Sequence, residues 1–202
     1  MRCSLAPLLG CTYRYINHAI VSAFVERWQP ETNTFHLTFG EIGITLYDVA
    51  TILKIPITGR SVSVPHHLTS GEASDLLYRL LGISVDVAAQ QIRENRGPYV
   101  KLDWLKKLFM HLPNSVSNEE IEHITRAYLL FLLGCTIFVD KSGTLVPVAY
   151  LILLDDLNMI DNYAWGAGCL AYLYRQLGIA SRRDVRSIAG YLTLLEVIIL
   201  IS

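Results

Sequence analysis

Four arginines toward the C-terminal end of the chain have the clearest potential for binding chemistry. They are Arg175, Arg182, Arg183 and Arg186. A positive charge in the first turn of a helix opposes the helix dipole, so Arg182 and Arg183 are unfavourable there unless an acid or a phosphate pairs with them. These arginines are therefore candidate contacts for a partner or a phosphate group. Pairing with Asp184 or Glu196, or plain solvation, is the commoner arrangement for such surface charges.

Acidic residues late in the chain could bind metal ions. Asp155, Asp156 and Asp161, with the distant Glu196, suggest a metal-dependent nuclease of the transposase type. Such an enzyme needs carboxylates that converge on a pair of ions, normally on a scaffold built from a sheet. These acids are instead expected at a helix junction, where capping and solvation explain them. The sequence predicts no metal site here.

A lysine could serve a pyridoxal phosphate enzyme as its Schiff base, and Lys141 is the best candidate. Such an enzyme also needs a phosphate cup and an acidic partner for the ring nitrogen. Lys141 lies in a segment that reads as a turn, Asp140-Lys141-Ser142-Gly143. The sequence Gly166-Ala167-Gly168 lacks the third glycine of a dinucleotide loop, which favours a role in helix packing. No cofactor is expected.

Histidines and cysteines also lack the spacing of known sites. His66 and His67 are adjacent in a polar loop without cysteine or carboxylate companions, which makes a poor set of metal ligands. His36 is expected on the polar face of a strand, hydrogen bonded to a neighbour. The four cysteines show no C-x-x-C pair and are expected to be reduced thiols. We therefore expect no catalytic residue and no enzymatic activity.

The composition favours one folded domain over residues 1–202. The chain is 52% apolar and 17% charged, so it can bury a core. With 17 basic and 18 acidic residues, its formal charge of -1 provides no general attraction for nucleic acid. No run reaches the roughly 18 apolar residues of a membrane span, so no membrane contact is expected.

A β-hairpin is predicted near the start of the chain. After a helix over residues 16–28, apolar residues alternate with polar ones from Thr34 to Phe39, which is typical of a half-buried strand. Taking Gly40-Glu41 as a two-residue turn gives three apolar pairs on one face. These pairs are Phe39 with Ile42, Leu37 with Ile44, and Phe35 with Leu46.

Helices are predicted for most of the remaining chain. Capping boxes at Thr45 with Asp48 and at Ser117 with Glu120 mark two helix starts, and Ser181 with Asp184 marks a third. Pro147 can occupy the first turn of another helix. Further helices are expected around residues 72–81, 102–110 and 163–177. The predicted fold is mainly α: a single compact multi-helix domain with one β-hairpin near the N-terminus.

The chain resembles the plant mobile domain, the module of MAINTENANCE OF MERISTEMS-like (MAIN-like) proteins, of long-form homologues of serine/threonine-protein phosphatase 7, and of some plant transposable elements. The matching blocks occur in family order and cover nearly the whole chain. They are residues 25–32 (VERWQPET), 34–37 (TFHL), 40–41 (GE), 44–50 (ITLYDVA), 102–105 (LDWL), 126–128 (RAY), 140–143 (DKSG), 165–166 (WG), 170–175 (LAYLYR) and 180–184 (ASRRD).

This resemblance implies a non-enzymatic interaction module in the nucleus, with a role in meristem maintenance, genome stability and silencing of transposable elements. It also implies a protein partner related to phosphatase 7. The family is often described as aminotransferase-like, which no cofactor site in this sequence supports. Residues 197–202 are apolar where the family continues through a tryptophan-containing helix, so we expect a domain shortened at its C-terminal end. The alternative is a nucleic-acid-associated protein derived from a transposable element, or a nonfunctional remnant.

Overall fold

The computed structural model describes residues 3–10, 18–65, 67–110, 117–181, 189–190 and 192–201. It is mainly helical with small sheets, which confirms the predicted fold class. The contacts divide the chain into two compact units. The first unit comprises Met1–Val62, Thr136–Lys141 and Asp161–Ser202, and the second comprises Ser63–Cys135 and Ser142–Ile160.

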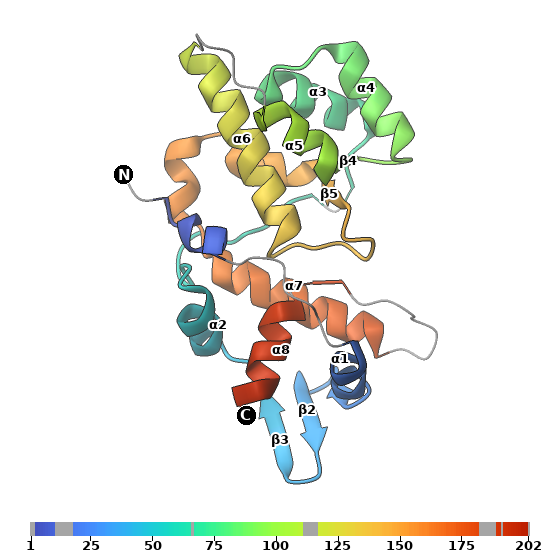
Figure 1. The fold of residues 1–202 in the computed structure, drawn as a ribbon, viewed down its shortest axis with the longest axis vertical. Coiled ribbons are helices and arrows are strands. Elements are labelled where there is room, and N and C mark those ends of the chain that lie inside the picture. Colours follow the sequence, from blue (N-terminus) through green and yellow to red (C-terminus); the bar gives the residue numbers. More distant parts are fainter. Residues whose placement is uncertain are drawn as a thin grey trace. The chain divides into compact units, whose positions relative to one another are not determined.

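The first unit combines a small antiparallel sheet with helices, of which α7 is the longest (Figure 1). Its elements are η1 (Ala6–Gly10), α1 (His18–Val25), β1 (Trp28–Gln29), β2 (Thr34–Leu37), β3 (Gly40–Gly43), α2 (Leu46–Leu53), α7 (Trp165–Ala180) and α8 (Leu192–Ile201). A short 3-10 helix, η3 (Leu157–Asn162), crosses the boundary between the two units along the chain.

The predicted hairpin is present, but its predicted turn is wrong. Leu37 pairs with Gly40 and Phe35 with Ile42, so the turn consists of Thr38 and Phe39. Phe39 is accordingly 75% exposed. Leu46 is not in the strand either, because it begins α2.

Polar contacts across the strands fit the observed register. The Glu41 carboxylate lies 3.1 Å from the His36 imidazole and accepts a hydrogen bond from the Thr34 hydroxyl at 3.3 Å. The His36 imidazole therefore lies close to a carboxylate of the neighbouring strand, and its expected hydrogen bond to a neighbour stays a prediction. The helix predicted over residues 16–28 was too long, because α1 ends at Val25. Trp28 instead lies in β1 and pairs with Phe35.

Helix α7 supplies much of the core of the first unit. Trp165 is fully buried at its start. A methyl group at Gly166 would come within 2.8 Å of the Ile57 side chain, and one at Gly168 within 2.8 Å of Val62. The two glycines therefore allow close packing of the helix, as predicted. The Tyr174 hydroxyl donates a hydrogen bond to the carbonyl of Ile44, which ties α7 to the end of β3.

A second close approach in the first unit joins two extended segments. The Arg60 N–H donates to the Asn162 carbonyl at 2.7 Å, and the Ala164 N–H donates to the Arg60 carbonyl at 2.9 Å. The Arg60 guanidinium also lies over the Tyr163 ring, 5.2 Å from its centre. Gly59, which precedes Arg60, has a φ of +135° that L side chains rarely adopt.

In its described residues the second unit is built from α-helices, a two-stranded sheet and a 3-10 helix (Figure 1). Its elements are α3 (Ser70–Leu81), α4 (Val85–Glu94), β4 (Tyr99–Lys101), α5 (Leu102–Met110), α6 (Asn118–Cys135), β5 (Leu145–Pro147) and η2 (Val148–Leu154). Strands β4 and β5 are antiparallel, with Val100 opposite Val146. Pro147 ends β5 just before η2, so the helix predicted there is a 3-10 helix.

Helix α6 carries a buried arginine. The predicted capping box at its start is confirmed, since the Ser117 hydroxyl and the Glu120 carboxylate exchange hydrogen bonds with each other's backbone N–H groups. Further along, Arg126 is only 8% exposed. Its guanidinium donates to the carbonyls of Leu154 at 3.1 Å and Asp155 at 3.0 Å, which fixes the end of η2 against α6.

The predicted turn at Asp140 to Gly143 is confirmed by a turn at Lys141 and a φ of +65° at Gly143. The helix predicted to start at Ser181 with Asp184 falls mostly on residues outside the described part. Within the described residues, no helix has the length and apolar character needed to cross a membrane.

Candidate functional site

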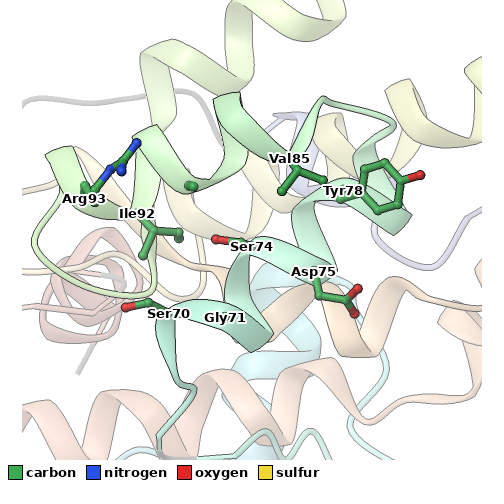
Figure 2. Close-up of a pocket in the computed structure, with 9 residues that line it drawn as sticks. Ser70, Gly71, Ser74, Asp75, Tyr78, Val85, Ile92 and Arg93 are labelled. Atoms are coloured by element: carbon green, nitrogen blue, oxygen red, sulfur yellow. The ribbon is translucent and has the colours of Figure 1, made fainter.

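An open groove of about 490 Å³ runs between α3 and α4 in the second unit (Figure 2). Its walls are mainly apolar or small side chains, with few charges at the edges. The lining residues are Ser70, Gly71, Ser74, Asp75 and Tyr78 from α3 and Val85, Ala89, Ile92 and Arg93 from α4. The groove is the candidate functional site.

Helix α3 is held in place by a capping box. The Thr69 hydroxyl accepts from the Glu72 N–H at 3.2 Å, and the Glu72 carboxylate accepts from the Thr69 N–H at 2.8 Å. One face of the helix is buried through Ala73 and Leu77. The groove face follows the helical spacing Ser70, Ser74, Tyr78. The small residues on this face leave a hollow instead of filling it.

Helix α4 forms the opposite wall. The Ser84 hydroxyl caps its start by accepting from the Val87 N–H at 3.4 Å. Val85, Ala89 and Arg93 recur at helical spacing along the groove. Ile92 is 2% exposed and forms part of the groove floor. Each of the two helices thus contributes one row of side chains, here called a stripe, to the same groove.

The groove has one apolar end and one basic end. Tyr78 and Val85 lie together at one end in Figure 2 and are 51% and 58% exposed. Ser70, Ile92 and Arg93 lie at the other end. Large apolar side chains that remain exposed beside a hollow are typical of a binding surface.

Some charged side chains at the rim of the groove have an ion-pair or hydrogen-bond partner, and one does not. The Asp75 carboxylate accepts from the Arg79 guanidinium at 2.8 Å. Glu94 accepts hydrogen bonds from the side-chain amides of Gln90 and Gln91. The Arg93 guanidinium is exposed and makes no hydrogen bond or ion pair with any residue that the structure describes. The groove therefore offers an uncommitted positive charge at one end.

The groove offers apolar surface and hydroxyl groups to a ligand. Its hydroxyls, on Ser70, Ser74 and Tyr78, have no histidine among the lining residues to act as a base. Apolar walls with one free charge match the features of a protein-binding surface.

The capping box that positions α3 gives a pH prediction. Hydrogen bonds from the Thr69 hydroxyl and then the Thr69 N–H lower the pKa of the Glu72 carboxyl below its usual value of 4.5. A lowered folded-state pKa stabilises the protein above the unfolded-state pKa, and the contribution is lost as pH falls through the folded-state value. We expect Glu72→Ala to lower the melting temperature at pH 7, with a smaller difference at pH 3.

Thermal melts followed by circular dichroism at both pH values measure this effect. Glu31→Ala is the control, because Glu31 is an exposed carboxylate without a hydrogen bond to any described residue. An equal loss for Glu72→Ala at pH 7 and pH 3 would contradict the role of the charged carboxylate.

Of the four predicted arginines, the structure places one. Arg175 is exposed on α7 in the first unit. Arg182, Arg183 and Arg186 lie outside the described residues. The predicted cluster is therefore neither assembled nor dispersed by the structure, and it remains a prediction.

The structure also shows the positions of the candidate lysine, histidine and aspartate residues. Lys141 is exposed in its turn, and His67 is exposed, while His66 lies outside the described residues. Asp156 accepts from the Asn158 N–H at 2.9 Å, and Asp161 accepts from the Ser4 N–H at 2.6 Å.

Metal and thiol chemistry receive no support from the described part of the chain. No three His, Cys, Asp or Glu residues there are grouped as metal ligands. Cys3, Cys135 and Cys169 are free thiols. Partial desolvation raises the pKa of Cys135 to about 11, so this thiol is mostly protonated at neutral pH.

Sequence reasoning missed the groove because it missed α4. A signal was present, since Val85, Ala88, Ala89 and Ile92 follow the helical spacing after a possible cap at Ser84. Recognising the groove would also have required noticing the small residues of α3. Neither pattern by itself indicates that the two stripes face each other.

Comparison with known proteins places these observations in a family. The plant mobile domain model matches residues 8–199. Over 181 residues, or 90% of the chain, it is 44% identical to Protein MAIN-LIKE 1, 45% to Protein MAIN-LIKE 2 and 42% to Protein MAINTENANCE OF MERISTEMS, all from Arabidopsis thaliana. The chain covers 35%, 26% and 36% of these proteins, and no solved structure matches it significantly. The chain belongs to the plant mobile domain family.

Proposed function

We propose that this chain is a non-enzymatic protein-interaction module that binds its partner through the groove between α3 and α4. The observation that carries this proposal is the exposure of Tyr78 and Val85 at the edge of a hollow lined by small side chains. Tyrosine is a common anchor in protein interfaces, and an exposed valine beside it adds apolar surface that loses contact with water when a partner covers it.

The expected gain from covering these side chains is substantial. Burial of a valine-sized or larger apolar side chain contributes about 1.5 to 3 kcal/mol. Val85 and Tyr78 are each about half exposed, so only part of that contribution is left for a partner to supply. A partner that covers the pair would gain this remaining part from Tyr78 and Val85, whereas Ile92, at 2% exposed, adds almost nothing to it.

We further propose that the module works in the nucleus, in meristem maintenance, genome stability and silencing of transposable elements. The name of one relative, Protein MAINTENANCE OF MERISTEMS, supports the first of these roles. A phosphatase-7-like protein is the proposed partner. The chain spans 26% to 36% of the length of the three relatives named above, so the role of a whole protein goes beyond this module.

A pair of valines on α4 allows a matched test. Val85 lines the groove, whereas Val87 is 40% exposed and does not line it. Both lie in the first turn of the helix, where an acidic residue favours the helix dipole. We expect Val85→Glu to reduce recovery of a phosphatase-7-like protein from plant nuclear extract at least tenfold, and Val87→Glu to leave it unchanged. Affinity capture with quantitative mass spectrometry measures both.

Two results would contradict the proposal. One is equal recovery with the two variants, which would place the interaction elsewhere. The other is amino-group transfer or Mg²⁺-dependent DNA cleavage by the purified chain. Nucleic-acid binding that falls steeply with salt, and weakens in a variant combining Arg182→Ala with Arg183→Ala, would favour a transposable-element-derived nucleic-acid-associated protein.

A further inference from the structure

We propose that the groove between α3 and α4 takes one amphipathic helix of a partner, with an acidic residue at the Arg93 end and a bulky apolar residue at the Tyr78–Val85 end. This inference rests on the proposed function and adds the form, charge and direction of the bound segment.

The length of the groove matches about two turns of a helix. The lining residues run from Ser70 to Tyr78 on α3 and from Val85 to Arg93 on α4. At 1.5 Å per residue each stripe is about 12 Å long. A helix that lies along such a groove presents anchors on one face at about every turn. Two parallel helical stripes therefore favour a third helix over an extended peptide.

The middle of the groove allows a close approach. Ser74 and Ala89 have small side chains and lie at the middle of the two walls. Nearer the Arg93 end, a methyl group at Gly71 would meet no atom within 4 Å, so the space above it is open. Helices packed over small residues approach at the short end of the usual 8–10 Å range between axes. The central anchor of the partner should therefore be small or medium in size.

The charges set the direction. Arg93 has no ion-pair partner among the described residues, so a carboxylate at this end would gain an interaction without breaking another. Asp75 lies on the α3 wall between the two ends and would repel an acid placed in the middle. Its pairing with Arg79 at 2.8 Å neutralises it only in part, because both side chains are exposed. The acidic residue is therefore favoured at the Arg93 end alone.

The apolar end complements this arrangement. Val85 lies about 12 Å from Arg93 along α4. Together with Tyr78 it exposes an apolar surface that a leucine or a larger side chain can cover. The partner helix is thus expected to carry three residues on one face at intervals of about one turn: an acid at the Arg93 end of the groove, a small or medium residue over its middle and a bulky apolar residue at the Tyr78–Val85 end.

A displayed peptide library tests the direction and the charge. The probe is an alanine-based helix of about 16 residues, with three positions on one face, each about one turn apart, varied over all amino acids. The library is selected against the whole chain and against three variants: Ser74→Leu, Arg93→Glu and Arg96→Glu. Ser74→Leu fills the middle of the groove with a good helix former. Arg96 is exposed but does not line the groove, so Arg96→Glu is the control for charge.

We expect the unchanged chain and Arg96→Glu to enrich Asp or Glu at one end of the varied face and a bulky apolar residue at the other. Arg93→Glu should enrich Lys or Arg in place of the acid, and Ser74→Leu should enrich nothing above background. Changing the acid of a selected peptide to lysine should weaken its binding to the unchanged chain about fivefold, with a smaller effect in high salt.

The outcomes separate this inference from the proposed function. One contrary result is a set of selected peptides that fail to bind Ser74→Leu and yet show no preference for an acid. Another is the same acid preference with Arg93→Glu. Either result would overturn the inference and leave the groove as a docking site. No enrichment with the unchanged chain, or enrichment that Ser74→Leu does not abolish, would overturn both. Circular dichroism melts of the variants verify that each one is folded.

Discussion

The Gly59→Ala variant should lose about 3 kcal/mol or more of its free energy of unfolding. Gly59 has a φ of +135°, and an added methyl group would overlap the Asn162 carbonyl and lie 3.2 Å from the Ala164 nitrogen. These atoms belong to backbone held by the hydrogen bonds of Arg60, so they cannot move aside without breaking them. Urea denaturation followed by circular dichroism measures the loss.

Gly178→Ala is the matched control for this prediction. Gly178 lies inside α7 with an ordinary helical backbone, and a methyl group there would meet nothing within 4 Å. Alanine is the better helix former, so we expect this variant to be up to about 1 kcal/mol more stable. If both substitutions changed stability equally, the close approach at Gly59 would not be the cause.

The Arg126→Met variant should lose about 3 kcal/mol of stability. The guanidinium is 8% exposed and donates to the carbonyls of Leu154 and Asp155, so its removal leaves two carbonyl acceptors without this donor. Hydrogen bonds to a charged group contribute about 1.5 to 3 kcal/mol, and methionine retains most of the apolar stem. The end of η2 should loosen first, which hydrogen exchange of residues 148–155 can detect.

The Arg79→Met variant tests whether burial of the arginine accounts for the stability loss expected for Arg126→Met. Arg126 pairs with Glu122 at 2.9 Å and Arg79 pairs with Asp75 at 2.8 Å, in each case four residues earlier on the helix, but the Arg79 side chain is 50% exposed. An exposed pair of this kind contributes about 0.3 to 0.5 kcal/mol. A loss from Arg126→Met no larger than that from Arg79→Met would show that the buried hydrogen bonds of Arg126 contribute little.

The helix starts could be predicted where the signal is local. The capping boxes at Thr45 and Ser117 each involve residues three apart, and both are present in the structure. Helix α4 has no such pair, because Ser84 is followed three residues later by Val87, which cannot return the hydrogen bond. Its start therefore carried only half of the pattern.

The hairpin illustrates why a correct element can have a wrong turn. The predicted and observed registers place Phe35 opposite different residues while keeping apolar side chains on the same face, so the alternation of residues cannot distinguish them. The observed register is accompanied by the contacts of Glu41 with His36 and Thr34. Such cross-strand polar contacts are visible only when both strands are placed.

The groove could not be predicted from either of its walls. The stripes of α3 and α4 follow helical spacing, but small residues at that spacing usually indicate close packing within a core. Whether such a stripe is filled or left open depends on how the two helices cross. Arg93 likewise reads as a favourable charge in the last turn of a helix, and only its place at the end of the groove suggests a partner.

The order of segments along the chain has a consequence for synthesis on the ribosome. The second unit ends at Ile160. The first unit is assembled from segments on both sides of the second unit in the sequence. The Trp28 ring packs against Tyr174 at 5.2 Å between centres, so this contact forms only after the whole second unit has been translated. At about 5 to 20 residues per second this delay lasts about 7 to 30 s. Through that interval the nascent β1–β3 sheet keeps apolar surface uncovered, and it is the part of the chain most in need of a chaperone.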